Sequence, residues 1–282
     1  MAAVNSSGTL RFFVFTLALS WVAVAVAPRL PAGGGPILVL ALFMPALVAI
    51  WLTVRSHGPS GLEALFARVL QWRVGLRWYG FAIGYMLAIR LTAALIQRVV
   101  AGSGPGFGHE PWYAIAGAVL ASTPFQAGEE IGWRGYALPR LARKFGFGSA
   151  GLIVGVVWAV WHFPLFFLLP GNANYGQSFP LFFLGVVPLS VAMTWLYVHT
   201  KGSVLLAMLM HSSVNQTHNI VQSGYAILSP LSINSTLISW LTILLLWLAA
   251  GFFLIQIRRS HARFAPLAGM PPSHTASVAD HN

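Results

Sequence analysis

The chain has 282 residues, of which 57% are hydrophobic and only 7% are charged. Soluble domains carry about 25% charged residues, so this composition excludes a soluble globular protein and predicts an integral, multi-pass membrane protein. The absence of cysteine excludes disulfides, thiolate metal sites and cysteine nucleophiles. The net charge of +11 does not indicate a nucleic-acid partner, because the basic residues must first be placed relative to the membrane.

Apolar segments long enough for a membrane span, which needs roughly 20 residues, recur along the whole chain. We count about eight, of which the seventh is the shortest. They are residues 10–27, 36–54, 78–97, 111–128, 149–169, 180–199, 203–218 and 235–257. The sequence therefore predicts an all-α fold, a polytopic transmembrane helix bundle of about eight spans.

The distribution of basic residues predicts the orientation of these spans. With the N-terminus in the cytoplasm, 13 of the 16 Lys and Arg residues fall in inside segments. Only Arg29 and Arg98 fall outside, and Arg90 falls within the third span. The positive-inside rule then predicts both termini in the cytoplasm, across the plasma membrane if the chain is bacterial. An alternative is that the first segment, with Arg11 and a small-residue run at 25–27, is a cleaved signal peptide.

The pattern divides the chain into four regions. Residues 1–109 form an N-terminal three-span segment, 110–219 a core that carries the polar motifs, and 220–257 the last span. Residues 258–282 form a cytoplasmic tail whose Pro, Ser, Ala and His content predicts disorder. The basic and partly aromatic stretch 55–77 lies either at the cytoplasmic interface beside anionic lipid heads or in an ordinary solvated loop.

Acidic side chains are rare and concentrated at one place. The whole chain contains Glu63, Glu110, Glu129, Glu130 and Asp280. Glu129 and Glu130 end the predicted fourth span, and ionisable groups in a membrane usually mark a functional site. Glu130 and Arg134 are four residues apart, which permits an ion pair, whereas Glu129 points about 100° away and is free for other work. The alternative is a solvated helix end before a basic loop.

Two further polar groups lie in predicted spans. His162 is placed in the middle of the fifth span, four residues after Trp158 and on the same face, with Pro164 expected to kink the helix. His211 and Asn215 share a face of the seventh span. Packing or interhelical hydrogen bonds would explain each group alone. The predicted topology places Glu129, His162 and His211 at comparable depth, so we expect them to line one cavity open to the cytoplasm.

In order along the chain, three motifs resemble those of the CPBP intramembrane protease family, which includes type II CAAX prenyl endopeptidases and bacteriocin-processing enzymes. Residues 129–134 fit its EExxxR motif, and residues 211–215 match its HxxxN motif. Residues 158–162 resemble its FxxxH motif, with Trp158 where Phe is usual. The resemblance covers about residues 110–219 and marks this region as a candidate catalytic core.

The resemblance implies hydrolysis of peptide bonds in membrane-associated substrates, such as CAAX-type proteins or leader peptides. It implies that Glu129 activates water, that His162 orients this water, and that His211 and Asn215 donate hydrogen bonds to the oxyanion. Glu130, Arg134 and Trp158 would be supporting residues. These roles suit amide hydrolysis, which needs a base, a water molecule and oxyanion donors. Membrane lipid and a membrane-anchored protein or peptide are then the expected partners, and the oligomeric state is left open.

A metal centre and a transporter are the competing interpretations. Glu129, His162 and His211 would be a plausible Zn²⁺ set, but another group would then have to serve as base, and the HExxH arrangement is absent. We therefore favour a metal-free mechanism. Intramembrane Glu and His residues also suit a proton-coupled transporter or channel, although the sequence shows no inverted repeat. A scaffold that keeps the motifs without activity is a third alternative.

Overall fold

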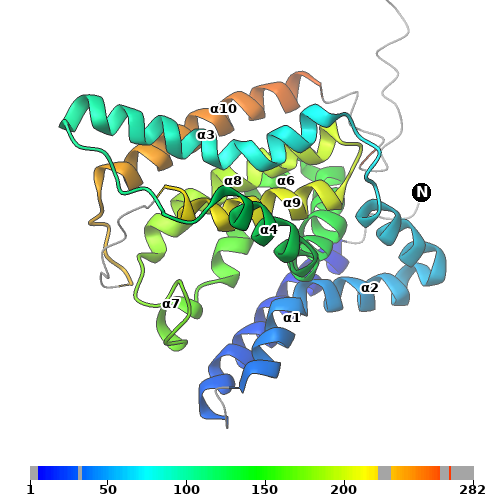
Figure 1. Ribbon diagram of the computed structural model, residues 1–282. Helices are drawn as coiled ribbons and strands as arrows, with labels where there is room; N and C mark the ends of the chain where they lie inside the picture. Colours follow the sequence, from blue (N-terminus) through cyan, green and yellow to red (C-terminus); the bar gives the residue numbers. More distant parts are fainter. Residues whose placement is uncertain (1–5, 31–33, 222–229, 261–266, 268–282) are drawn as a thin grey trace, which may run out of the picture.

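The computed structural model describes residues 6–30, 34–221, 230–260 and 267. All regular structure in this part of the chain is helical, so the prediction of an all-α fold is confirmed (Figure 1). The α-helices are α1 (Ser6–Val26), α2 (Gly35–Val69), α3 (Leu76–Ala101), α4 (Trp112–Ser122), α5 (Ala127–Glu130), α6 (Leu138–Trp161), α7 (Leu165–Leu168), α8 (Phe179–His199), α9 (Val204–Gln216) and α10 (Leu237–Arg259). We predicted that the tail is disordered. Its residues after Ser260, apart from Leu267, lie outside the described part of the chain.

Each of the eight predicted apolar segments is largely helical. By length and hydropathy, six helical stretches of the described residues could cross a membrane. One of them, Trp112–Leu168, is a run of 57 residues that contains both the fourth and the fifth predicted segment. The seventh segment corresponds to α9, whose 13 residues are short for a span. The number of spans and the cytoplasmic position of both termini stay predictions.

The stretch between the fourth and fifth predicted spans is helical rather than an open basic loop. After α4 the chain continues through a 3₁₀ turn, η3 (Thr123–Gln126), through α5, and through a π-helix, η4 (Ile131–Ala137), into α6. All seven residues of η4 are buried. Because buried backbone groups need hydrogen-bond partners, a buried stretch of this length favours a helix over an open loop.

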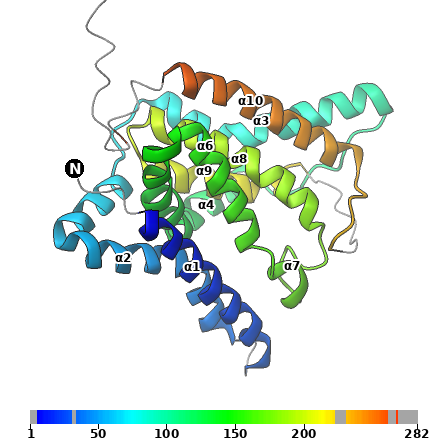
Figure 2. The ribbon, with the colours of Figure 1, turned by 180° about the vertical axis from the view of Figure 1, so that it is seen from behind.

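The helices form a bundle around α6 and α8, which lie side by side at its centre (Figures 1 and 2). α10 packs on α8 and α3, and α9 packs between α3 and α4. The close approach of α6 to α8 depends on a small residue: a Cβ atom at Gly155 would lie 2.9 Å from Cβ of Ser190 and 3.0 Å from Cα of Val187. Such small-residue contacts are a common way for membrane helices to associate.

The paired helices α1 and α2 extend from one end of the bundle, and α2 also packs against α5 and η4 (Figure 1). A Cβ atom at Gly132 would lie 2.6 Å from Cβ of Pro45, and one at Gly128 would lie 3.0 Å from the carbonyl oxygen of Leu42. The N-terminal region, in which the sequence showed no functional motif, therefore packs directly against the segment that carries Glu129.

We predict that Gly132→Ala destabilises the protein, because its added methyl group would overlap Pro45 in α2. Overpacking of this kind typically lowers the free energy of unfolding by about 1–3 kcal/mol. Gly117→Ala is the matched control, since a Cβ atom there meets nothing within 4 Å. Denaturant unfolding in detergent micelles measures both variants. Equal stability of the two would show that the α2 contact is not tight.

Candidate active site

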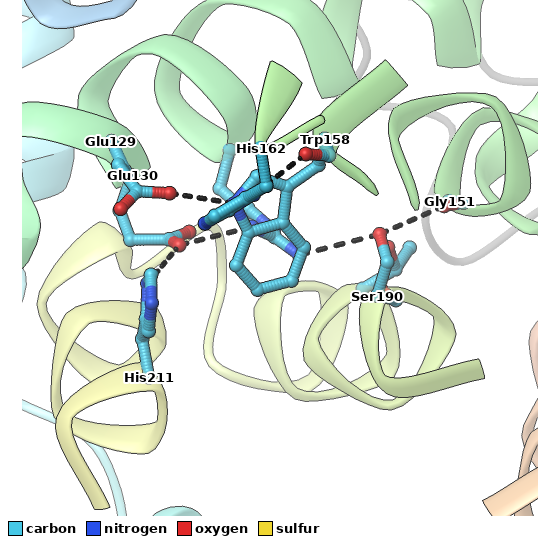
Figure 3. Close-up of polar contacts among 9 residues, drawn as sticks. Glu129, Glu130, Gly151, Trp158, His162, Ser190 and His211 are labelled. Carbon is cyan, nitrogen blue, oxygen red and sulfur yellow. Dashed lines mark hydrogen bonds and ion pairs between the residues drawn. The ribbon is translucent and has the colours of Figure 1, made fainter. Parts of the chain in front are cut away.

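Three parts of the bundle bring the predicted polar residues together. Glu129 and Glu130 end α5, Trp158 lies in the last turn of α6, and His211 lies in the middle of α9. Figure 3 shows these four side chains and His162 turned toward one another. Glu129 is only 4% exposed and Glu130 is fully buried. The interpretation of the two glutamates as a solvated helix end is therefore wrong.

Glu130 is the centre of a buried charge network. Its Oε1 atom accepts a hydrogen bond from Arg134 at 3.0 Å and lies 2.9 Å from Nδ1 of His211. The predicted ion pair between Glu130 and Arg134 is thus present, and both side chains are 0% exposed. Because a carboxylate only accepts hydrogen bonds, Nδ1 of His211 is the donor in this contact. The contact leaves Nε2 as the nitrogen of His211 that is available to a substrate.

Arg134 reaches across the bundle to α8. Its second terminal nitrogen donates to Oγ of Ser190 at 3.3 Å, and this hydroxyl in turn donates to the carbonyl oxygen of Gly151 at 2.8 Å. The guanidinium carbon of Arg134 also lies 4.6 Å from the centre of the Trp158 ring. A buried guanidinium requires such compensation. Ser190 was not predicted from the sequence. Only its polar side chain within the apolar segment 180–199 distinguishes it there.

Trp158 holds the carboxylate of Glu129 directly. Its indole Nε1 donates to Oε2 of Glu129 at 2.6 Å, and its ring lies edge-on to His211 at a centroid distance of 5.1 Å. Trp158, which stands where Phe is usual in the motif, thus does more than pack against the site. A phenylalanine has no N–H group, so it could not make this hydrogen bond.

His162 follows the end of α6, where the helix stops at Trp161, three residues before the buried turn residue Pro164. The kink expected at Pro164 is present as this turn, and His162 lies at its start, within the apolar stretch that ends at Leu168. Nδ1 of His162 lies 2.9 Å from the carbonyl oxygen of Trp158, and a carbonyl can only accept. Nε2 then remains as an acceptor, and the ring is within electrostatic range of Glu129 and His211.

Asn215 is the predicted site residue that this network does not include. It lies one turn after His211 on α9 and is exposed. Its carbonyl oxygen accepts from His218, and the hydrogen bonds of the described residues do not join its side chain to the glutamates. α9 itself is held beside α4, because Ser212 bonds both Ser122 and the carbonyl oxygen of Val119. The contacts of Ser212 were not predicted from the sequence.

The three residues that we considered for Zn²⁺ do not fit a metal centre in this arrangement. Among the described residues, no group of three or more His, Cys, Asp or Glu side chains is placed to hold a metal ion. We therefore derive no step through a metal.

Comparison with known proteins agrees with the motifs. A family model described as type II CAAX prenyl endopeptidase Rce1-like matches residues 107–217. This match lies within the region whose three motifs resemble the CPBP family. The chain is also similar to CAAX prenyl protease 2 of Methanococcus maripaludis, with 31% identity over 101 residues. This alignment covers 33% of the chain and 36% of the relative, so it spans about a third of each protein.

The matched segment, residues 107–217, contributes every side chain of the charge network. It holds Glu129, Glu130 and Arg134 as well as both histidines, whereas α1, α2, α3 and α10 lie outside it. Those other helices support the matched segment by packing against it, and Pro45 of α2 lies in close contact with Gly132.

We predict that Glu130 and Arg134 are strongly coupled in stability. Removing one partner of a buried pair typically costs about 3–5 kcal/mol, because the other charge is left uncompensated. We expect Arg134→Met to lower the free energy of unfolding by about that amount, and Glu130→Gln to lower it as well. The free energy of unfolding of the double variant should fall by clearly less than the sum of the decreases in the two single variants. A double-mutant cycle measured by unfolding in micelles tests this, and strictly additive losses would contradict it.

Proposed function

We propose that this chain is an intramembrane endopeptidase that hydrolyses peptide bonds of membrane-associated substrates with water activated by Glu129. The observation that carries the proposal is the arrangement around Trp158. This residue bonds the Glu129 carboxylate, and its ring contacts both His162 and His211. The similarity of residues 107–217 to type II CAAX prenyl endopeptidases supports the same activity and favours it over the transporter or channel alternative.

In the proposed reaction, Glu129 is the general base. The Trp158 hydrogen bond fixes one of its carboxylate oxygens, and the other takes a proton from the attacking water. Nε2 of His162 orients this water as its oxygen attacks the carbonyl carbon. When the C–N bond breaks, Glu129 returns its proton to the leaving nitrogen, which completes the hydrolysis.

The oxyanion of the tetrahedral intermediate needs donors that are already in place before the reaction. We propose that His211, protonated on both ring nitrogens in its ion pair with Glu130, is one such donor, since Glu130 and Arg134 hold its ring in one orientation. Asn215, one turn further along α9, is the second donor that the family resemblance implies. Its exposed side chain would turn to a bound substrate rather than to the glutamates.

Membrane-associated proteins with a cleavable end are the proposed substrates. The similar archaeal protein is called a CAAX prenyl protease, which favours CAAX-type substrates, and leader peptides are the other class that we consider. The proposed location is a membrane that the chain crosses several times, with the site open to the cytoplasm.

We predict that Glu129→Gln lowers the cleavage rate by about 10²–10⁴-fold, the usual contribution of a general base. Comparative mass spectrometry of membrane-protein termini, in cells that carry the wild type or the variant, reveals the cleaved substrates. Glu110→Gln is the control, because it makes the same change at an exposed position. Identical termini in all three strains, together with solute flux in liposomes, would overturn the protease in favour of a transporter.

We predict that Trp158→Phe lowers kcat by about tenfold with a smaller change in KM, because Glu129 loses the donor that holds its carboxylate. Trp195→Phe is the matched control, since the buried Nε1 of Trp195 has no hydrogen-bond partner in the described structure. Cleavage of a membrane-tethered reporter by the purified proteins gives both constants. Equal rates of the two variants would show that Trp158 acts through packing alone.

A further inference from the structure

A second group of charged residues lies outside the candidate active site, where α2 meets η4 and α6. It surrounds a pocket of about 150 Å³. The pocket is lined by Thr53, His57, Gly61, Ala64, Leu65, Arg68, Gly135, Pro139, Arg140 and Arg143. The lining thus contains three arginines and a histidine but no acidic residue. Like charges this close repel one another, so the pocket favours an anion.

Two of the arginines are held in place by the backbone of η4. Arg68 donates to the carbonyl oxygen of Gly135 and Arg140 to that of Tyr136, each at 3.1 Å. Arg140 also stacks on the Tyr136 ring at 3.6 Å. A guanidinium has five N–H donors, so each arginine keeps donors for a ligand after these contacts. Arginine in this setting suits a phosphate group, which it can bind with two parallel hydrogen bonds.

The surroundings of the pocket point to a membrane surface. The chain from the end of α2 to the start of α3 exposes large apolar side chains next to basic ones, among them Phe66, Leu70, Trp72 and Leu76. Arg73 and Arg77 stack on the neighbouring rings of Trp72 and Trp78. Exposed apolar and basic residues together are typical of a segment at the interface with anionic lipids. The positive-inside rule predicts this side of the bundle to be cytoplasmic.

A bend in α2 places this segment beside the pocket. Gly58 interrupts the helix with φ 61° and ψ −154°, and α2 turns in direction along its length (Figure 1). Because positive φ is readily available only to glycine, the bend is built into the sequence. It allows the apolar first half of α2 to cross the membrane while the half that carries Arg68 follows a different direction.

We propose that this pocket binds the phosphate of an anionic lipid headgroup in the cytoplasmic leaflet. Its volume suits a single small anionic group, since pockets for whole small molecules usually enclose about 300–1,000 Å³. The lipid tails would lie along the exposed apolar residues between α2 and α3. Because Arg68 and Arg140 also bind η4, the bound phosphate would hold in place the helical turn that contains Arg134. The proposal does not depend on the protease activity.

The test is lipid binding by the purified full-length protein, measured by native mass spectrometry with phosphatidylglycerol and phosphatidylcholine of identical tails. The wild type should prefer phosphatidylglycerol, and the pair Arg140→Gln and Arg143→Gln should weaken that binding by about tenfold or more. The pair Arg258→Gln and Arg259→Gln is the control, because it removes the same charge from exposed positions on the same predicted side. Its affinity should stay within about twofold of the wild type.

A milder variant and a soluble anion complete the experiment. Arg143→Gln changes an exposed residue, so it should weaken lipid binding without loss of folding even if the double variant is unstable. Inorganic phosphate should compete only at far higher concentration than the lipid. Equal weakening in the pocket and control pairs, no preference between the two lipids, no effect of Arg143→Gln, or phosphate binding as tight as the lipid would each overturn the proposal.

Discussion

The structure depends on placing a charged pair, Glu130 and Arg134, inside a bundle of apolar helices where both side chains are fully buried. Burying such a pair is costly, and hydrogen bonds from neighbouring groups offset part of that cost. Here α9 supplies His211 to the carboxylate, and α8 supplies Ser190 to the guanidinium. The need to compensate one pair therefore brings three parts of the chain together. Glu129, the next residue, is positioned by the same packing.

Much of the fold followed from the sequence because long apolar segments have few alternatives to a helix in a membrane. The stretch after Glu129 was predicted wrongly for a physical reason. Arg134, Arg140 and Arg143 resemble a basic cytoplasmic loop when only their charge is counted. The structure instead buries Arg134 and holds Arg140 against η4, so position in the bundle, and not charge alone, decides their role.

The candidate site also contains contacts that the sequence predicts and contacts that it does not. The spacing of Glu130 and Arg134 predicted their ion pair because four residues make one helical turn. The bond from Trp158 to Glu129 was not predictable in this way, because it joins α6 to α5 and depends on how these helices pack. The same is true of Ser190, which local sequence could mark only as polar. Spacing within a helix thus predicts contacts along one helix, whereas contacts between helices require the packed bundle.

The glycines on either side of the two glutamates have a consequence for protein engineering. Gly128 and Gly132 leave the backbone of α5 and η4 in direct contact with α2, so the N-terminal helices replace the side chains that this surface lacks. A shortened chain that began near residue 107, where the family match begins, would present this bare backbone to lipid tails. Residues 107–217 therefore do not form a self-sufficient unit without α2. Chimeras between relatives would have to exchange α2 together with the glutamate-bearing turn.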